Sequence, residues 1–417
     1  MRVCLLGYRG NPYAGGQGIY IYHLTRALVA LGHQVDVIVG PPYPQPLERW
    51  ARVHRVPNLN LWGVYRREWL PRGDPLALYR PWHLFDFAAT RFRFFSEPLS
   101  FSFRALGEVA RLLRRQRFDV LHDVQTLGYG MLLMRAFGIP LLTTVHHPLT
   151  VDRREAFARN ETFEELYHTA VFYPVTMQGR VIRRVDHVIT ASQAGKAEIA
   201  QDFRVAPERI SIVNNGLDTE RFHNPGHWPR EPSTLLFVGN SDDFKKGAVY
   251  LVRALALLPE SVRLRIVDEP YPVKQRVWPE AERLGVQHRI TFTGRLDEER
   301  LREEYCRATM LVQPSVFEGF GLPAAEALAC QTPVVATDAG AVSEVVTPDC
   351  GLLAPPRDPA ALATAIQALL DDPARRERMG MAGRERMVRE FSWPVCAANT
   401  AAVYGKVVSQ RAATAAA

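Results

Sequence analysis

Short apolar strands that end in glycine or polar residues recur along this chain, and this pattern constrains the fold more than any other feature. The first example is an apolar strand at residues 2–7, a glycine-rich loop, a helix at 19–31 and a second strand at 33–40. Gly32 lies just past the helix, where glycine favours a left-handed end. A strand, a helix and a strand in this order form a βαβ unit, which predicts a parallel sheet covered by helices.

The same pattern appears on both sides of a proline-rich, polar stretch. Helices are predicted at 249–258, 297–307 and 359–370, and further strands at 118–124, 139–147, 185–192, 210–216, 233–240, 262–268, 289–294, 308–315, 332–337 and 350–356. We therefore predict an α/β protein of two Rossmann-like domains, 1–220 and 234–393, joined by a linker at 221–233. A helix from about 394 to 417 is expected to pack back on the first domain. Open α/β sheets bind ligands at the carboxyl ends of their strands, so we expect a central cleft that both parallel sheets face.

Composition narrows the class of protein. The chain has 417 residues, of which 47 % are apolar and 23 % are charged, as in ordinary globular domains. Its five cysteines are scattered without a C-x-x-C pair, which argues against a disulfide framework or a zinc site. The first apolar run is too short for a signal peptide, and we find no long uncharged apolar stretch, so we expect a cytoplasmic protein without a membrane span. The net charge of +7 permits an anionic substrate, an anionic membrane face or nucleic acid, and selects none of them.

The segment FEGFGLPAAE (317–326) combines two acids with a glycine turn and the start of a helix. Pro323 fits a first helical turn, and the glycines let a ligand approach the backbone closely. The free amides of a helix N-terminus favour anionic oxygens. Glu318 and Glu326 are each suited to accept hydrogen bonds from neighbouring hydroxyls of a sugar or ribose. An anion site between two diol sites matches the outline of a nucleotide sugar, although acids that merely favour a helix N-terminus explain the segment equally well.

Five segments resemble, in the family's order, the retaining glycosyltransferases of the GT-B fold, especially the large family-four group with its E-x7-E signature. They are AGGQGIYIYHLTRALVALGHQVDVIV (14–39), TTVHH (143–147), NNGLD (214–218), FVGNSDDFKKGAVYLVRAL (237–255) and FEGFGLPAAE. Residues 326–366 continue the pattern, and the resemblance covers nearly the whole chain. It implies a GT-B architecture in which the first domain recognises the acceptor and the second binds the donor.

The resemblance implies roles for residues of the second domain. Glu318 would hold hydroxyls of the transferred sugar, and Glu326 would hold the ribose hydroxyls. Lys246 would neutralise the diphosphate, since a compact ammonium suits phosphate oxygens. The backbone amides that would meet the sugar and the diphosphate belong to Gly319, Phe320, Gly321 and Leu322.

In the first domain, the resemblance places His146 against the sugar and the reacting centre. Gly15 and Gly16 would form a flexible loop against the distal phosphate and the acceptor. Gln17 is unusual in this loop and is an acceptor-side candidate. Asn215 is another, although its segment reads first as a turn.

Two positions depart from the family's pattern. The arginine that commonly follows the glycine of FVG is replaced by Asn240, whose amide donates hydrogen bonds but carries no charge. Diphosphate binding is then weaker or relies on another cation, for which Arg295 is a candidate by location. The family's Gly-x-Gly-Pro near the nucleobase reads VDEP here (267–270), so the base stays open.

Residues 60–105 are rich in aromatic side chains and arginines. Core packing under a long excursion explains many of the aromatics without a ligand. The same composition suits a glycan, a lipid-linked acceptor or the inner face of a membrane, so peripheral membrane contact is one expectation for this region.

These features predict a retaining enzyme that moves a hexose-type sugar from a UDP- or GDP-linked donor to a hydroxyl of a glycan, a glycolipid or a small molecule. The leaving diphosphate would take the acceptor proton in a front-face displacement, while the protein positions the reactants and stabilises charge. We find no D-x-D pair for a metal ion, so we expect neither a metal nor a cofactor.

Three alternatives stay open from the sequence. A nucleotide-sugar epimerase on the same fold would isomerise its donor without an acceptor. An NAD-dependent dehydrogenase is disfavoured because, after Gly16 and Gly18, Ile21 stands where the G-x-G-x-x-G fingerprint needs its third glycine. A nucleic-acid-binding protein lacks support from any zinc, RRM or KH pattern, and we expect no nucleic-acid partner.

Overall fold

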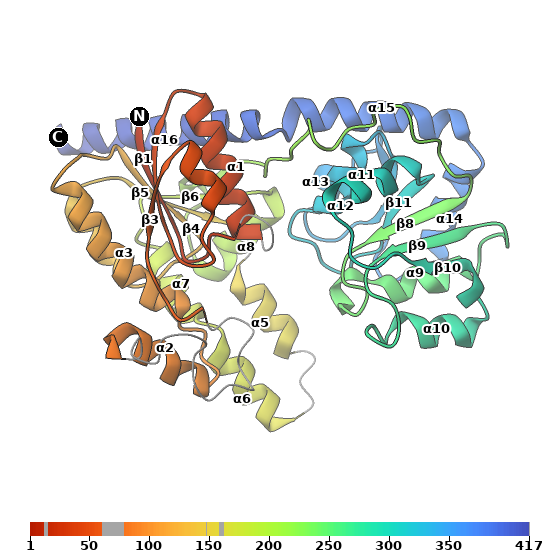
Figure 1. The fold of residues 1–417 in the computed structure, drawn as a ribbon, viewed down its shortest axis with the longest axis horizontal. Coiled ribbons are helices and arrows are strands. Elements are labelled where there is room, and N and C mark those ends of the chain that lie inside the picture. Colours follow the sequence, from red (N-terminus) through yellow and green to blue (C-terminus); the bar gives the residue numbers. More distant parts are fainter. Residues whose placement is uncertain (12–15, 61–78, 147, 158–161, 417) are drawn as a thin grey trace. The chain divides into compact units, whose positions relative to one another are not determined.

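The computed structural model describes residues 1–11, 16–60, 79–146, 148–157 and 162–416. The chain forms two compact α/β units (Figure 1). Unit 1 comprises Met1–Ala191, Gly195–Gly216 and Cys396–Ala417, and unit 2 comprises Ser192–Ala194 and Leu217–Val395. Each unit contains one parallel sheet, so the predicted α/β class with two parallel sheets is confirmed.

Unit 1 is built on a seven-stranded parallel sheet in the order β3-β2-β1-β4-β5-β6-β7. Its strands are β1 (Arg2–Gly7), β2 (Gln34–Val39), β3 (Arg52–Arg55), β4 (Val120–Val124), β5 (Leu141–Val145), β6 (His187–Thr190) and β7 (Ile210–Ile212). Its helices are α1 (Gly16–Ala30), α2 (Pro81–Arg91), α3 (Glu97–Leu113), α4 (Gly130–Met134), α5 (Leu149–Phe157), α6 (Phe163–Phe172), α7 (Val175–Ile182), α8 (Gln193–Phe203) and the long α16 (Trp393–Ala416). Apolar residues of α3, α4, α7 and α8 pack with strand residues in one buried core.

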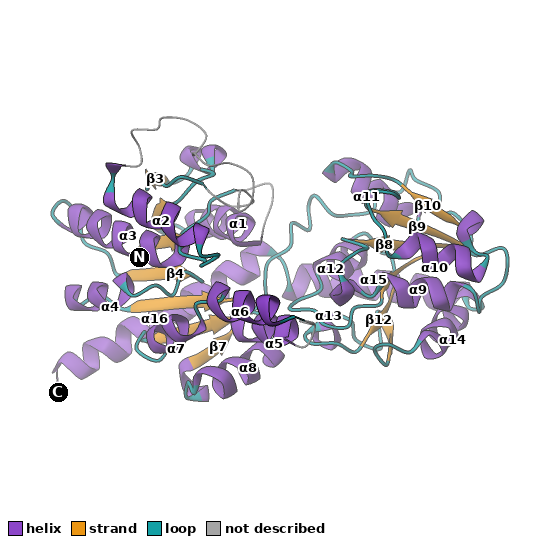
Figure 2. Cartoon of the chain, turned by 90° about the horizontal axis from the view of Figure 1, so that it is seen from below, coloured by secondary structure: helices purple, strands orange, loops and turns teal. Residues whose placement is uncertain are grey.

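Unit 2 has a six-stranded parallel sheet in the order β10-β9-β8-β11-β12-β13. Its strands are β8 (Thr234–Val238), β9 (Arg263–Val267), β10 (Ile290–Phe292), β11 (Met310–Gln313), β12 (Val334–Thr337) and β13 (Gly351–Ala354). Its helices are α9 (Ala248–Leu255), α10 (Val277–Leu284), α11 (Glu298–Arg307), α12 (Leu322–Ala329), α13 (Val342–Val345), α14 (Pro359–Leu370) and α15 (Pro373–Glu390). Figure 2 shows helices on both sides of these strands.

Alternation along β8 explains why both faces of the second sheet are covered. Leu235 and Phe237 belong to a core with α9, α10 and α14, whereas Leu236, which points to the other face, belongs to a core with α11, α12 and α15. A strand that is buried on both faces reads as a continuous apolar run, as the sequence TLLFV does here.

The predicted strands correspond to strands of the structure, and capping explains the best-matched helices. α14 covers the predicted range 359–370 because the side chain of Asp358 accepts a hydrogen bond from the amide of Ala361. α11 begins after Asp297, whose side chain caps the amide of Arg300 in the same way. Sequence patterns did not reveal β3, α2 and α3, which lie between β2 and β4.

The stretch at 221–233, expected to be a linker, lies within unit 2. Phe222 is buried in the core with α11 and α12. Glu231 forms ion pairs with Arg265 at 2.7 Å and with Arg307 at 2.5 Å. The stretch has neither helix nor strand, and these side chains hold it against the sheet.

The last helix, α16, begins in unit 2 and belongs to unit 1 from Cys396 onward. The hydroxyl of Tyr404 lies 2.6 Å from Nδ1 of His122, a fully buried residue of β4. The other ring nitrogen of His122 lies 2.7 Å from Oγ1 of Thr144 in β5. Burial lowers the pKa of His122 to about 3, so this histidine is a neutral link between the sheet and the end of the chain.

Candidate active site

The helix of the E-x7-E segment begins at Leu322, as the position of Pro323 predicted. Gly321, just before it, has φ of +92°, a left-handed conformation that glycine adopts without strain. The loop before the helix is fixed by Gly340, because a Cβ there would lie 2.2 Å from the carbonyl oxygen of Glu318. That same oxygen accepts a hydrogen bond from the amide of Ala341 at 3.0 Å. The loop is therefore held in one conformation at the N-terminus of α12.

The Glu318 carboxylate lies in a cluster of donors at the ends of two strands. Lys246, just past β8, donates from Nζ to Oε2 at 2.7 Å. Gln313, the last residue of β11, donates from Nε2 to the same oxygen at 3.2 Å, and the Ser315 hydroxyl lies 3.5 Å away. The Lys246 and Glu318 side chains are 30 % and 14 % exposed, so this ion pair is open to solvent on one side. The structure thus brings together two residues that are 72 positions apart in sequence.

Glu326 is in a different environment. It is buried, and Oε2 accepts a hydrogen bond from the hydroxyl of Tyr305 at 2.7 Å. Burial raises the pKa of Glu326 to about 7, against the weaker opposing effect of the Tyr305 hydrogen bond. Among the described residues, no contact joins the Glu318 and Glu326 carboxylates. Sequence reasoning missed Tyr305 because a tyrosine in a helix normally indicates core packing.

Asn240, which stands in the family's arginine position, holds a lysine. Its Oδ1 accepts a hydrogen bond from Nζ of Lys274 at 2.6 Å. The Lys274 ammonium also lies 3.7 Å from a carboxylate oxygen of Asp268, just past β9. A cation therefore stands at the end of β8 despite the substitution. Arg295, expected as a candidate by location, has a side chain that is 86 % exposed and lies 3.5 Å from Glu269.

Lys274 had no signal of its own in the sequence. It lies in the irregular stretch between β9 and α10, 34 positions from Asn240. The one hint in the sequence is Asn240 itself, because an uncharged amide in the family's arginine position indicates that another residue supplies the cation.

In unit 1, His146 follows β5 at the carboxyl edge of the sheet. Nδ1 donates a hydrogen bond to Oδ1 of Asn215 at 3.1 Å, so these two predicted residues are brought together. Nε2 is buried and has no hydrogen-bond partner among the described residues. Burial lowers the pKa of His146 to about 4, and the Tyr20 ring packs edge-on at 4.4 Å. His146 is thus neutral near pH 7, with Nε2 as an unused acceptor.

Gln17 lies beside the end of β4. Its Nε2 donates to the carbonyl of Val124, and Oε1 is buried without a partner among the described residues. The neighbouring Gln125, which sequence reasoning missed, accepts from the amide of His146 at 2.9 Å. Gly16 is exposed at the start of α1. Gly15 lies outside the described residues.

The aromatic and basic region divides into parts with different environments. Residues 61–78 lie outside the described residues. Trp82 of α2 stacks on Phe103 of α3 at 5.0 Å, and Phe95 stacks on Phe172 at 5.6 Å, as core packing predicts. Phe92 differs, because 70 % of it is exposed. No helix within the described part of the chain is long and apolar enough to cross a membrane.

The chain matches known protein families along most of its length. Residues 218–386 match the family described as Glycosyl transferases group 1, and residues 14–88 and 72–221 match Glycosyltransferase Family 4. It is 38 % identical to an MMP α-(1→4)-mannosyltransferase of Mycolicibacterium hassiacum, over 99 % of this chain and 100 % of that protein. It is 29 % identical to a glycogen synthase of Mycobacterium tuberculosis, over 97 % of this chain and 94 % of that protein.

Solved structures of glycosyltransferases have the same fold as this chain. Sucrose-phosphate synthase from Thermosynechococcus elongatus superposes with a TM-score of 0.72 at 25 % identity, over 98 % of this chain and 99 % of that one. HepE from Anabaena, solved in complex with UDP, has the same fold, with a TM-score of 0.70 at 17 % identity over 97 % and 100 % of the two chains. The fold and these matches define a glycosyltransferase. More narrowly, the chain belongs to the group 1 glycosyltransferases, with the two parallel-sheet domains of the GT-B fold, as its motifs predicted.

Proposed function

We propose that this glycosyltransferase is a retaining hexosyltransferase that uses a nucleotide diphosphate sugar and needs no metal ion. The observation that carries the proposal is the Lys246–Glu318 ion pair in front of the N-terminus of α12. A diphosphate suits an ammonium group together with the backbone amides of the glycine turn that leads into this helix, since Pro323 has no amide hydrogen and the Ala324 amide donates to Oε1 of Gln313 at 3.1 Å. When the diphosphate takes Lys246, the Glu318 carboxylate is released to accept hydrogen bonds from the hydroxyls of the sugar.

Lys274 supplies a second cation in this proposal. Asn240 holds its ammonium at the end of β8, near the start of the loop that carries Lys246. In a front-face displacement the leaving diphosphate removes the proton of the acceptor hydroxyl. The two lysines then stabilise the negative charge that grows on the leaving group, and a divalent ion is not required.

Glu326 binds the ribose hydroxyls in this proposal. Among the described residues its carboxyl has one polar partner, the hydroxyl of Tyr305, and it has two oxygens with which to accept hydrogen bonds. Neighbouring ribose hydroxyls would share that carboxylate with Tyr305.

His146 acts on the transferred sugar through Nε2. The ring is neutral, and Asn215 fixes the proton on Nδ1, so Nε2 accepts a hydrogen bond from a sugar hydroxyl. A ligand hydroxyl would satisfy a buried acceptor that otherwise costs stability.

Mannose is the proposed sugar, and an α-(1→4) bond is the proposed linkage. The support is the name of the Mycolicibacterium relative, which is similar to this chain over its full length. GDP-mannose is accordingly the first donor to test.

The test offers GDP-mannose, UDP-glucose and UDP-galactose to the enzyme with methyl α-mannoside as acceptor. We expect an α-linked product from GDP-mannose, identified by NMR, at a rate that an excess of EDTA leaves unchanged. A β-linked product would exclude retention, and loss of activity in EDTA would exclude metal independence. Isomerised donor in the absence of acceptor would identify an epimerase instead.

A further inference from the structure

A second polar site lies at the carboxyl edge of the unit 1 sheet, separate from the residues around His146. Asn58, Leu59 and Asn60 follow β3, and Arg9 follows β1. These two strands flank β2 in a parallel sheet, so both segments emerge at the edge where His146 follows β5. Among the described residues, a pocket at this place is lined by Asn58, Leu59, Asn60, Asp86, Thr90, Ser96 and Glu97. We call it the Glu97 pocket.

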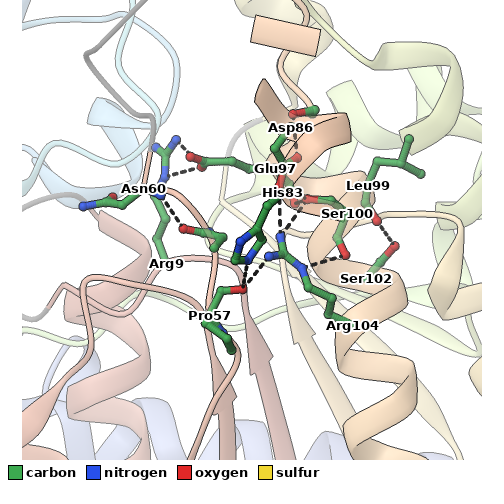
Figure 3. Close-up of polar contacts among 12 residues, drawn as sticks. Arg9, Pro57, Asn60, His83, Asp86, Glu97, Leu99, Ser100, Ser102 and Arg104 are labelled. Atoms are coloured by element: carbon green, nitrogen blue, oxygen red, sulfur yellow. Dashed lines mark hydrogen bonds and ion pairs between the residues drawn. The ribbon is translucent and has the colours of Figure 1, made fainter. Parts of the chain in front are cut away.

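Two buried carboxylates of the Glu97 pocket are held in fixed orientations, as Figure 3 shows. Arg9 donates to Oε2 of Glu97 from Nε at 2.9 Å and from a terminal nitrogen at 2.6 Å. Asp86 accepts from the hydroxyls of Ser96 at 2.8 Å and Ser100 at 2.9 Å, and from Arg104 at 3.2 Å. Because both arginine contacts go to Oε2, the other oxygen of Glu97 remains an acceptor for a ligand.

The charges in and around the pocket are balanced. Burial raises the pKa of Asp86, opposed by Ser100 and Arg104, and raises that of Glu97, opposed by Arg9. Each carboxylate thus has its own guanidinium partner. A further anion would meet two carboxylates that are both buried, where repulsion is strong. The balance of charge therefore favours a neutral ligand.

The lining also indicates which neutral group fits. Carboxylate oxygens and the Nδ2 donor of Asn58, whose Oδ1 accepts from the amide of Asn60 at 2.7 Å, suit a hydroxyl, which both donates and accepts hydrogen bonds. The Thr90 hydroxyl donates to the carbonyl of Phe87 at 2.8 Å, so it can still accept one. The pocket has room for a single group the size of a water molecule. A ring does not fit inside, but one hydroxyl of a larger molecule does.

We propose that the Glu97 pocket binds a hydroxyl group of an uncharged carbohydrate acceptor. This inference rests on the proposed function, because it assumes transfer to an acceptor hydroxyl. It goes beyond that function by naming where in unit 1 the acceptor is held and by requiring that the acceptor carry no phosphate or carboxylate near the group that enters the pocket.

The test measures the acceptor KM in three pocket variants, Glu97→Gln, Thr90→Val and Asn58→Ala, with GDP-mannose and methyl α-mannoside as substrates. We expect the acceptor KM to rise about tenfold in Glu97→Gln and at least about threefold in the other two, because each loses one hydrogen bond to the ligand. The donor KM and the hydrolysis of donor without acceptor should stay within about twofold of wild type.

A control variant, Arg111→Gln, removes a surface ion pair with Glu108 on the same helix, α3. It should leave the acceptor KM unchanged. Unchanged acceptor KM in both Thr90→Val and Asn58→Ala would overturn the proposal. An equal loss of donor hydrolysis and transfer in all three pocket variants would do so as well, since it would mark a structural role.

Charge provides the last discrimination. We expect wild-type enzyme to prefer methyl α-mannoside over mannose 6-phosphate, and equal use of the two would also overturn the proposal. If the wild-type enzyme shows no transfer with any of the donors and carbohydrate acceptors tested, the proposed function itself fails. If the wild-type enzyme transfers sugar but the pocket variants leave the acceptor KM unchanged, only this inference fails.

Discussion

The residues predicted to contact the donor differ in charge between the carboxyl edges of the two sheets. In unit 2, the groups are charged and partly open to solvent, and each cation is paired with a protein oxygen, as in Lys246–Glu318 and Lys274–Asn240. In unit 1, His146 is buried and neutral, and one of its ring nitrogens has no partner among the described residues. Under the proposed function, unit 2 exchanges an internal ion pair for an anion, whereas unit 1 accepts a hydrogen bond from a neutral hydroxyl.

The largest expected effect tests the charged side of this comparison. Glu318→Ala should lower kcat by about 10²- to 10³-fold, because the carboxylate that would hold the sugar in the transition state is lost. Calorimetry should find nearly unchanged affinity for GDP. Glu326→Ala should show the reverse, with GDP affinity about tenfold weaker and a smaller loss in kcat.

Glu280 offers a matched control in the same unit, because it is a carboxylate paired with Arg253 and Arg283 on the surface. Glu280→Ala should leave kcat and GDP affinity within about twofold. Wild-type behaviour of both Glu318→Ala and Glu326→Ala would remove the assignment of either carboxylate to the donor.

The neutral side of the comparison is tested by His146→Ala, for which we expect a loss of about 100-fold in kcat/KM. GDP affinity should not change, because the cations and amides proposed to bind the diphosphate belong to unit 2. His187 is a suitable control. It is also buried with a pKa lowered to about 4 by burial, but it begins β6 and thus lies at the opposite edge of the same sheet. If His187→Ala shows the same loss in kcat/KM as His146→Ala, both histidines contribute only to the stability of the fold.

A smaller effect is expected for Lys274, and it would measure how much this cation contributes to GDP binding. Lys274→Ala should weaken GDP binding about tenfold, because one cation near the diphosphate is removed, and it should lessen the dependence of binding on salt. Adding Asn240→Arg to this variant should restore most of the affinity. Arg295→Ala, which removes an exposed cation, should have no effect. Failure of the double variant to recover would show that the position of Lys274, rather than its charge, matters.

The smallest effect concerns pH and has opposite signs at the two sites. The folded-state pKa of Glu326 is raised to about 7, so its contribution to stability is present below about 4.5 and is lost as pH rises through 7. The pKa of His146 is lowered to about 4, so its contribution is present above about 6.5 and is lost as pH falls through 4.

Denaturant unfolding of Glu326→Gln would measure this difference. Compared with wild type, the variant should gain about 1 kcal/mol at pH 8 relative to pH 5, because glutamine has no charge to bury but keeps part of the Tyr305 hydrogen bond. Parallel stability profiles for the two proteins would contradict a raised pKa at Glu326.

The sequence predicted unit 2 better than unit 1, for a physical reason. The central strands β8, β11 and β12 are buried on both faces, and α11 and α14 are capped by Asp297 and Asp358, so local pattern and final structure agree there. In unit 1, β3 has the sequence RVHR, with arginines at both ends and no residue that is fully buried, and such an edge strand leaves little apolar signal. α2 and α3 contain several aromatic residues, and the apolar pattern of the sequence did not show that these segments are helices.

The candidate site was predictable where a motif carried it and not where distant segments meet. Glu318, Glu326 and Lys246 stand in recognisable motifs. Tyr305 and Lys274 reach the site from other segments, and their side-chain contacts follow from tertiary packing alone. The pocket around Glu97 likewise brings segments after β1 and β3 together with two helices. The spacing of these residues in the sequence does not predict this contact.

The contact between His122 and Tyr404 has a consequence for biosynthesis. The two residues are 282 positions apart, and the whole of unit 2 is translated between them. On the ribosome, the nascent first unit therefore exposes the place where α16 will dock, and Nδ1 of His122 lacks its Tyr404 partner until α16 emerges. Completion of the first unit must wait for the second to be synthesised, so termination between Cys396 and Tyr404 leaves unit 2 whole and unit 1 unfinished.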